Sequence, residues 1–381
     1  MTIEEILAMP EVERKIYYLK KGRKTEQPNA HALYNDWNPN KHEIVIDEEK
    51  YPKIKITTQP EKRITDPKTG KEYVEPAVRK EVDPNRIALP IEQDIVNIQT
   101  AFTVGTEPVL DCQPDESEES LLSTLKQVFK KNKLKYQNKK VVRAWLAEQE
   151  VAEYWYVVKD DGFWAKLKRK ISGIFGKSKP EYRLKSAIWS PFRGDKLYPF
   201  FNDQWDLVAL SREYKKKDLN DVEITCFMTI TKDMVYQWEL TSNWTDKGSF
   251  AHGFKKMPVI YMYRPEAYCE KIKSLRVRLE KLLSNYADCI DYHFFPILML
   301  FGNVENFSGE FKNRVVELTG QGANAQYLTW SQVPDTVKFE VETLLSQIYG
   351  LTNTPRISFD SLKGTGNAVS GVTFDYVFMY T

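Results

Sequence analysis

The sequence contains few of the residues from which metal and disulfide sites are built. It has four cysteines and four histidines. The cysteines, Cys112, Cys226, Cys269 and Cys289, lack the paired spacing by which disulfide frameworks and zinc sites are recognised. No two histidines lie within helical reach of each other. We therefore expect free thiols in a protein that folds in a reducing cytosol, and neither a metal site nor a cofactor.

Long apolar runs are also missing. The longest, residues 294–301 (FFPILMLF), has eight residues, whereas a membrane-spanning helix needs about 20. The N-terminal sequence MTIEEILAMPEVERK is acidic where a secretion signal would have a basic and then an apolar stretch. The sequence therefore predicts neither a transmembrane segment nor a secretion signal.

An excess of charge of one sign is the third absence. The chain has 55 basic and 53 acidic residues, which gives a formal net charge of +2. Such a balance provides no general attraction to nucleic acid or to an anionic membrane, so any contact with DNA must be local. The hydrophobic fraction of 42% is typical of a globular protein, and the aromatic fraction of 13% favours large buried surfaces within and between subunits.

The first part of the chain has the composition of a peripheral arm. A short acidic helix is expected over residues 3–19, followed by a polar stretch rich in Pro, Lys and Glu with a turn at residues 66–70 (DPKTG). We therefore assign residues 1–84 to an N-terminal peripheral arm. The folded body is expected to begin near residue 85, because Ile91, Ile95 and Ile98 recur at helical spacing.

The following 180 or so residues alternate between helical and strand patterns and predict an α+β fold. Two helices are expected first, and then a series of strands rich in β-branched and aromatic residues. The helices are predicted at residues 121–131 and 139–150, and the strands at 152–159, 187–191, 205–214, 224–230 and 234–240. A basic segment at residues 162–181 interrupts the strands and is interpreted as an insertion.

The most regular helical pattern follows Pro265. Six apolar residues, spaced 3, 4, 3, 4 and 4 apart, form one stripe that favours packing against other helices. They are Ile272, Leu275, Leu279, Leu282, Tyr286 and Ile290. A second helix is predicted from residue 333 to about 349, with a small β-like insert between the two helices. The chain stops within the apolar segment 372–381, so we expect this sequence to be part of a longer protein.

Three segments resemble the portal proteins of tailed double-stranded DNA bacteriophages. Residues 99–110 (QTAFTVGTEPVL) resemble an early helix end and turn of that family. Residues 253–263 (GFKKMPVIYMY), with the long helix after them, resemble the entry into the first stem helix. Ser370 and Gly371, followed by an apolar run, resemble the start of the long helix beyond the tunnel loop. The order and spacing of these segments carry the resemblance.

The resemblance implies a portal fold with a mixed α/β wing, a two-helix stem, a small β-containing clip and a tunnel loop, with the crown absent from this chain. It divides the chain into seven segments. They are the arm at 1–84, the wing at 85–262 with its insertion at 162–181, stem helix 1 at 264–292, the clip at 293–332, stem helix 2 at 333–352, the tunnel loop at 354–370 and the start of the long wing helix at 371–381.

The resemblance also implies a function. The expected protein is a non-enzymatic subunit of a closed ring of twelve copies, located at the capsid vertex of the virion and assembled in the host cytoplasm. Double-stranded DNA would pass through the ring without sequence-specific contacts, and the partners would be terminase, a head-tail adaptor, and the major capsid and scaffold proteins. The six apolar residues of the stem helix would contact neighbouring subunits. The channel loop would present Arg356, Lys363, Gly364, Gly366 and Asn367 to DNA.

Two other functional classes remain open from the sequence. A packaging-associated enzyme would require a phosphate-binding loop, but residues 176–178 (GKS) have Ile171 where that motif requires its first glycine. A membrane-interacting module would use the segment 162–181, in which Trp164, Leu167, Ile171 and Ile174 lie at helical spacing among lysines. No pair of nucleophile and base suggests a catalytic site.

Overall fold

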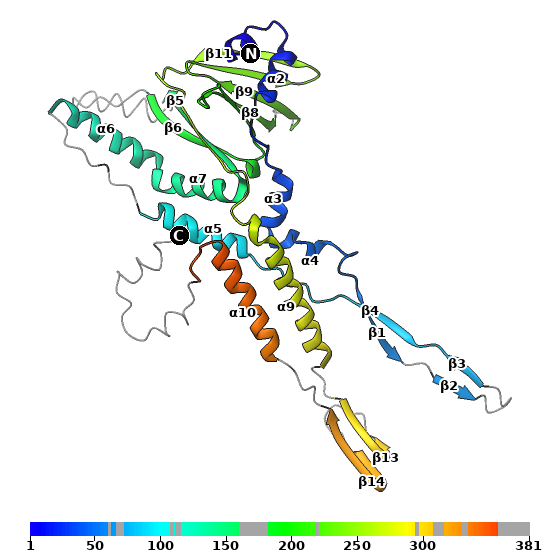
Figure 1. Cartoon of the computed structure of the whole chain (residues 1–381). Coiled ribbons are helices and arrows are strands. Elements are labelled where there is room, and N and C mark those ends of the chain that lie inside the picture. The colour runs from blue at the N-terminus through cyan, green and yellow to red at the C-terminus, as the bar shows by residue number, and fades with distance from the viewer. Residues whose placement is uncertain are drawn as a thin grey trace, which may run out of the picture. The chain divides into compact units, whose positions relative to one another are not determined.

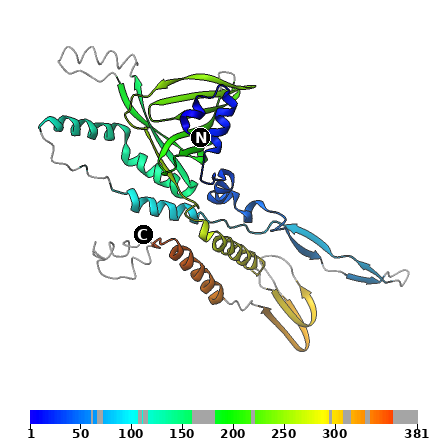
Figure 2. The ribbon, with the colours of Figure 1, turned by 45° about the horizontal axis from the view of Figure 1, so that its top comes forward.

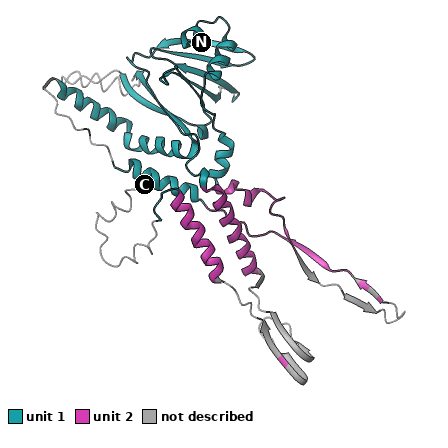
Figure 3. Cartoon of the chain, in the orientation of Figure 1, with its two compact units in different colours: residues 1–38, 90–271, 352–381 teal, residues 39–89, 272–351 magenta. Residues whose placement is uncertain are grey.

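The fold was analysed in a computed structural model of the chain. It describes residues 1–59, 62–65, 72–106, 110, 116–159, 182–217, 221–293, 297–307, 316–328 and 334–356. The chain forms two compact units (Figure 3), and each is described separately. Unit 1 comprises Met1–Asn38, Pro90–Lys271 and Thr352–Thr381, and unit 2 comprises Pro39–Leu89 and Ile272–Leu351. Helices and antiparallel sheets are both abundant, as the α+β prediction requires.

Unit 1 contains two antiparallel sheets and six α-helices within the described residues (Figure 1). Its helices are α1 (Ile3–Leu7), α2 (Val12–Lys21), α3 (Ala30–Trp37), α5 (Ile91–Val104), α6 (Glu116–Asn132) and α7 (Leu134–Glu148). Its strands are β5 (Glu150–Lys159), β6 (Tyr182–Trp189), β7 (Lys196–Phe201), β8 (Leu207–Lys217), β9 (Glu223–Ile230), β10 (Met234–Leu240), β11 (Trp244–Ala251) and β12 (Val259–Tyr263). The sheet orders are β11-β10-β9-β8-β7 and β12-β5-β6.

A hydrophobic core joins these two sheets. Tyr154 and Trp189 of the three-stranded sheet pack with Leu210, Met228 and Val235 of the five-stranded sheet. Because side chains alternate along a strand, the residues between them point to the other face. The five-stranded sheet is therefore apolar on both faces and needs a second cover.

The N-terminal helices provide that cover, which corrects the prediction of a peripheral arm. The helices α1 and α2 lie against the five-stranded sheet (Figure 2). Ile6 of α1 and Leu19 of α2 pack with Phe227 and Trp238 on the second face of this sheet. Leu19 is fully buried. The helix predicted over residues 3–19 is divided at Pro10, since proline removes a helical hydrogen bond. An arm was predicted because the charged residues on the outer faces of both helices resemble those of a solvated segment.

In its described residues, unit 2 contains a pair of long helices and three two-stranded pairings. Its helices are α4 (Glu43–Ile46), α9 (Lys273–His293) and α10 (Pro334–Leu351). Its strands are β1 (Ile54–Gln59), β2 (Lys62–Thr65), β3 (Glu72–Glu75), β4 (Val78–Val82), β13 (Ile297–Phe307) and β14 (Val316–Leu328), which pair as β1-β4, β2-β3 and β13-β14. The strands β2 and β3 pair antiparallel on either side of the predicted turn, and the turn itself lies outside the described residues.

Several other elements agree with the sequence patterns, and some differ. The strand predicted at 234–240 is β10, and the helix predicted around Ile91, Ile95 and Ile98 is α5. The long helix after Pro265 begins only at Lys273, after a short 3-10 turn. The strands β7 and β11 were missed, because β7 contains Pro199 and the edge strand β11 has mostly exposed, polar side chains.

Candidate subunit-interface and channel residues

The helices α9 and α10 pack side by side within unit 2 (Figure 1). Leu344 and Ile348 of α10 are buried, and Phe339 on the opposite side of the same helix is 73% exposed. An ion pair between Arg278 Nη2 and Glu340 Oε1, 2.6 Å apart, joins the two helices at their surface. Exposed pairs of this kind contribute little to stability, so the apolar contact is the main attraction between the helices.

The six residues of the predicted apolar stripe differ in how deeply they are buried. Ile272 and Leu279 are fully buried within the chain, so their side chains are not available to another subunit. These two residues therefore cover the chain's own interior, and the intersubunit role of the stripe stays a prediction. Leu275, Leu282 and Tyr286 are half-buried. Ile290 is 38% exposed, so the outer part of the stripe remains available for contacts between subunits.

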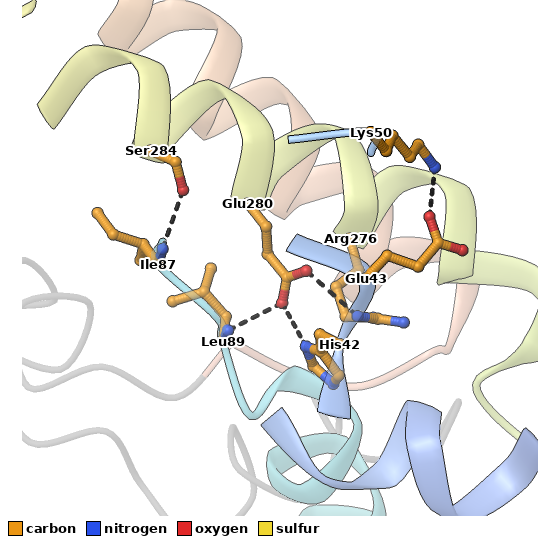
Figure 4. Close-up of polar contacts among 8 residues, drawn as sticks. All are labelled: His42, Glu43, Lys50, Ile87, Leu89, Arg276, Glu280 and Ser284. Atoms are coloured by element: carbon orange, nitrogen blue, oxygen red, sulfur yellow. Dashed lines mark hydrogen bonds and ion pairs between the residues drawn. The ribbon is translucent and has the colours of Figure 1, made fainter. Parts of the chain in front are cut away.

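A buried polar cluster lies beside this stripe and centres on the Glu280 carboxylate (Figure 4). His42 Nδ1 lies 2.6 Å from Glu280 Oε1, and the backbone N–H of Leu89 donates to the same oxygen over 2.9 Å. Arg276 Nη1 lies 3.2 Å from the other oxygen, Glu280 Oε2. One turn further along α9, Ser284 Oγ accepts from the N–H of Ile87 over 2.9 Å.

The cluster ties the segment from Pro39 to Leu89 to α9 within unit 2. The side chains of His42, Arg276 and Glu280 are at most 2% exposed. A buried carboxylate is tolerated only when its lone pairs are satisfied, as they are here by three partners. Sequence reasoning missed this cluster, because residues of the first and last thirds of a chain come together without any local pattern.

Two arginines of α9 form ion pairs within the chain. Arg276 pairs with Glu280 four residues along the same helix, and Arg278 pairs with Glu340 of α10. Helical geometry places residues four apart on the same face, so the first of these pairs could have been expected from spacing alone.

The backbone that follows α10 is held by two residues of unit 1. The phenol of Tyr268 donates to the carbonyl oxygen of Thr352 over 2.6 Å. The side-chain amide of Gln99 on α5 donates to Thr354 Oγ1 over 3.0 Å. Asn353 lies between the two threonines with a φ of 47°, a left-handed conformation that ends helices and that asparagine tolerates. The exit from α10 therefore has a defined path.

Of the five predicted channel residues, the structure describes one. Arg356 lies two residues beyond Thr354 and is exposed. Lys363, Gly364, Gly366 and Asn367 lie outside the described residues, as does the segment 162–181 with the candidate phosphate loop and membrane face.

Within the described ranges, no group of three or more His, Cys, Asp and Glu side chains is arranged to hold a metal ion. The helices of the same ranges include none that is both long enough and apolar enough to cross a membrane. Cys226 and Cys269 are buried free thiols, and Cys289 is an exposed one.

The predicted clip starts with the apolar run 294–301, of which residues 297–301 belong to β13 and residues 294–296 lie outside the described residues. This strand begins at Ile297 and pairs antiparallel with β14, and the register shifts after Phe301 and after Val304. Such shifts mark β-bulges, which bend a strand. The predicted β insert between two long helices is therefore present as a two-stranded pairing.

The chain was then compared with known proteins. Residues 40–380 match the family described as Phage portal protein, SPP1 Gp6-like. No curated protein sequence matches the chain. The family match begins one residue after the start of unit 2 and leaves out α1, α2 and α3. Because it extends over most of the sequence, including both α9 and α10, the chain belongs to the SPP1 Gp6-like family of phage portal proteins.

Proposed function

We propose that this chain is the repeating subunit of a ring of twelve copies through which double-stranded DNA enters and leaves a phage capsid. Portal proteins are structural components of the phage virion, and the family match over residues 40–380 is the observation that carries the proposal. In this ring, residues 264–292 and 333–352 are the stem helices and residues 293–332 the clip. The subunit performs no chemistry of its own.

The described part of unit 2 supports an assembly role. Even after α9 and α10 pack together, Ile290 and Phe339 remain 38% and 73% exposed. Large apolar side chains exposed on paired helices favour burial against another surface. In a ring, each copy contacts its two neighbours through two different surfaces. The ring closes when the rotation between neighbouring copies is a whole fraction of a full turn.

The loop after Thr354 is the proposed contact with DNA. Tyr268 and Gln99 hold its beginning, so Arg356 and Lys363 would lie at a repeated position around the ring. A few cations per subunit give weak, salt-dependent contacts with phosphates and carry no sequence information. Weak contacts of this kind would allow the DNA to move through the ring. The proposed clip faces terminase during packaging and the head-tail adaptor afterwards, and the wing contacts the capsid and scaffold proteins.

Electron microscopy with mass measurement of the purified protein tests this function. We expect closed rings with a central opening and a mass that is a whole multiple of the 44.5 kDa chain. Rings should retain double-stranded DNA only weakly, and less with rising salt. A protein that stays monomeric at every concentration, or that hydrolyses ATP, would contradict the proposal.

A further inference from the structure

A cavity of about 920 Å³ lies on one face of the three-stranded sheet in unit 1. Alternation along β5 places Val151, Glu153 and Trp155 on the same face. Val151 packs against Val141 and Ala144 of α7. Further along the strand, Glu153 and Trp155 line the cavity instead, together with residues of α6 and α7. Its volume is in the range of small-molecule sites.

Four lysines line this cavity. They are Lys126 and Lys130 of α6, Lys133 at the turn between the helices, and Lys135 of α7. Lys133 has a φ of 53°, a left-handed conformation that is unfavourable for lysine. This turn brings the four side chains to one place. No carboxylate of the described ranges forms an ion pair with any of them, so their mutual repulsion favours a bound anion.

The lining of the cavity includes a buried carboxyl group. Glu153 is 7% exposed, and its Oε1 atom has no hydrogen-bond partner among the residues that the structure describes. Burial raises the pKa of this carboxyl, whereas the nearby Ser186, whose hydroxyl also lacks a hydrogen-bond partner there, lowers it. Leaving a buried acceptor unsatisfied costs about 1–3 kcal/mol. A ligand that donates to Oε1 would recover that energy.

Three aromatic side chains complete the lining. Phe129, Tyr136 and Trp155 lie around the same cavity, and Tyr136 is 62% exposed although it is large and mostly apolar. Aromatic faces are the surfaces on which nucleic-acid bases stack, whatever the base. The cavity therefore combines cations, aromatic faces and one buried hydrogen-bond acceptor.

We propose that this cavity binds a nucleotide. The lysines would hold the phosphates, the aromatic side chains would stack on the base, and Glu153 Oε1 would accept a hydrogen bond from an amino group of the base. An acidic peptide would satisfy the lysines but would bring carboxylates towards Glu153, and a fatty acid would leave Oε1 without a donor. A free nucleotide and the unpaired end of a DNA strand present the same chemistry.

Calorimetric titration of the purified protein with cytidine and uridine triphosphates tests the base contact. These ligands differ on one edge of the base: cytosine has an amino group at C4 and an unprotonated N3, and uracil has a carbonyl oxygen at C4 and an N3–H. At C4 only the amino group of cytosine can donate a hydrogen bond to a carboxylate. We expect CTP to bind about tenfold more tightly than UTP, a difference equal to about 1.4 kcal/mol. Glu153→Gln should abolish the preference, because an amide both donates and accepts.

A matched pair of double variants tests the phosphate contacts. Lys130→Ala with Lys135→Ala removes two cations that line the cavity, whereas Lys131→Ala with Lys140→Ala removes two exposed lysines of the same helices that do not line it. The first pair should weaken CTP binding at least tenfold and the second less than twofold. Equal losses would show that only the general charge of the surface matters.

Competition experiments identify the source of the nucleotide and complete the test. In these experiments, bound CTP is displaced either by unlabelled CTP or by a single-stranded dodecamer of deoxycytidine. If the dodecamer displaces it at the lower concentration, the ligand is a DNA strand. If CTP does so, the ligand is a free nucleotide. The proposal is overturned if inorganic tripolyphosphate binds as tightly as CTP, or if neither CTP nor the dodecamer binds. These measurements do not depend on ring assembly, so they can fail while the portal function stands.

Discussion

His42 Nδ1 lies 2.6 Å from Glu280 Oε1, although the two residues are 238 positions apart in the sequence. Both side chains are almost completely buried. The contact fixes the segment before the β1-β4 ribbon to the middle of the long helix α9 within unit 2. An element predicted to build the stem is thus already coupled inside the subunit to a part of the chain that the sequence assigned to an arm.

Removal of the Glu280 carboxylate should destabilise unit 2. The Glu280→Ala variant leaves the Leu89 N–H without this acceptor and removes the ion pair between Arg276 and Glu280. Breaking a buried pair from one side costs about 3–5 kcal/mol. Urea unfolding of the variant should show a loss of this order. Glu270→Ala, a change at an exposed glutamate beside the same helix, is the control and should alter stability by less than about 0.5 kcal/mol. A small loss for Glu280→Ala would mean that the cluster does not hold the segment.

The N-terminal helices should behave as part of the core. Leu19→Ala creates a cavity at a fully buried position of α2, which costs about 2–5 kcal/mol. Tyr17→Ala on the same helix alters a side chain that is 58% exposed and should have a much smaller effect. Thermal unfolding followed by circular dichroism distinguishes the two. Equal, small effects would support the prediction that these helices belong to a peripheral arm, which was assigned to residues 1–84.

Glu148 should make the stability of unit 1 depend on pH. Burial raises the pKa of this carboxyl to about 7, while the Phe192 N–H that donates to it over 2.7 Å acts in the opposite direction. Between the ordinary value of 4.5 and about 7, the folded state binds more protons than the unfolded state, so the free energy of unfolding falls as the pH rises through this interval.

The Glu148→Gln variant measures that contribution. Glutamine keeps an acceptor for the Phe192 N–H but does not titrate, so the variant should lose less stability than the original protein between pH 4.5 and pH 7. The difference should be roughly 2–3 kcal/mol, since each unit of pKa shift corresponds to about 1.4 kcal/mol. Urea unfolding at a series of pH values gives both curves. Parallel curves would show that Glu148 is not the group responsible.

The outer face of α10 should contribute to assembly. Phe339→Asp places a charge where a 73% exposed phenylalanine lies, and burying an unpaired charge between subunits is costly. We expect ring formation to shift to at least tenfold higher protein concentration, as measured by mass photometry, with unchanged unfolding of the monomer. Gln347→Asp adds the same charge about 80° further around the helix and serves as the control. If both variants assemble like the original protein, this face of α10 is not in the subunit contact.

The sequence patterns located most regular elements because their causes are local. The spacing of Ile91, Ile95 and Ile98 predicted α5, and the β-rich run at 234–240 predicted β10. The strands β7 and β11 could not be found in this way, since one contains a proline and the other is polar. Their pairing with β8 and β10 comes from backbone hydrogen bonds, which carry little side-chain signal.

The candidate site was predictable in outline and not in detail. The stripe on α9 follows from a helical period, but the period cannot tell a residue buried inside the subunit, such as Leu279, from one left exposed, such as Ile290. Burial depends on which partner occupies each side of the helix. The positions of His42 and Glu280 give no sign of their contact for the same reason.

The sequence by itself determined the α+β class, the order of helix, β insert and helix, and the resemblance to phage portal proteins, because these depend on local periodicity and on the order of segments. Only the tertiary structure decided that α1 and α2 cover the second face of the five-stranded sheet, that Glu280 has three partners, and that Glu153 lines a cavity together with four lysines. Each of these depends on contacts between distant parts of the chain, and such contacts arise from complementary packing, which no short window of sequence contains.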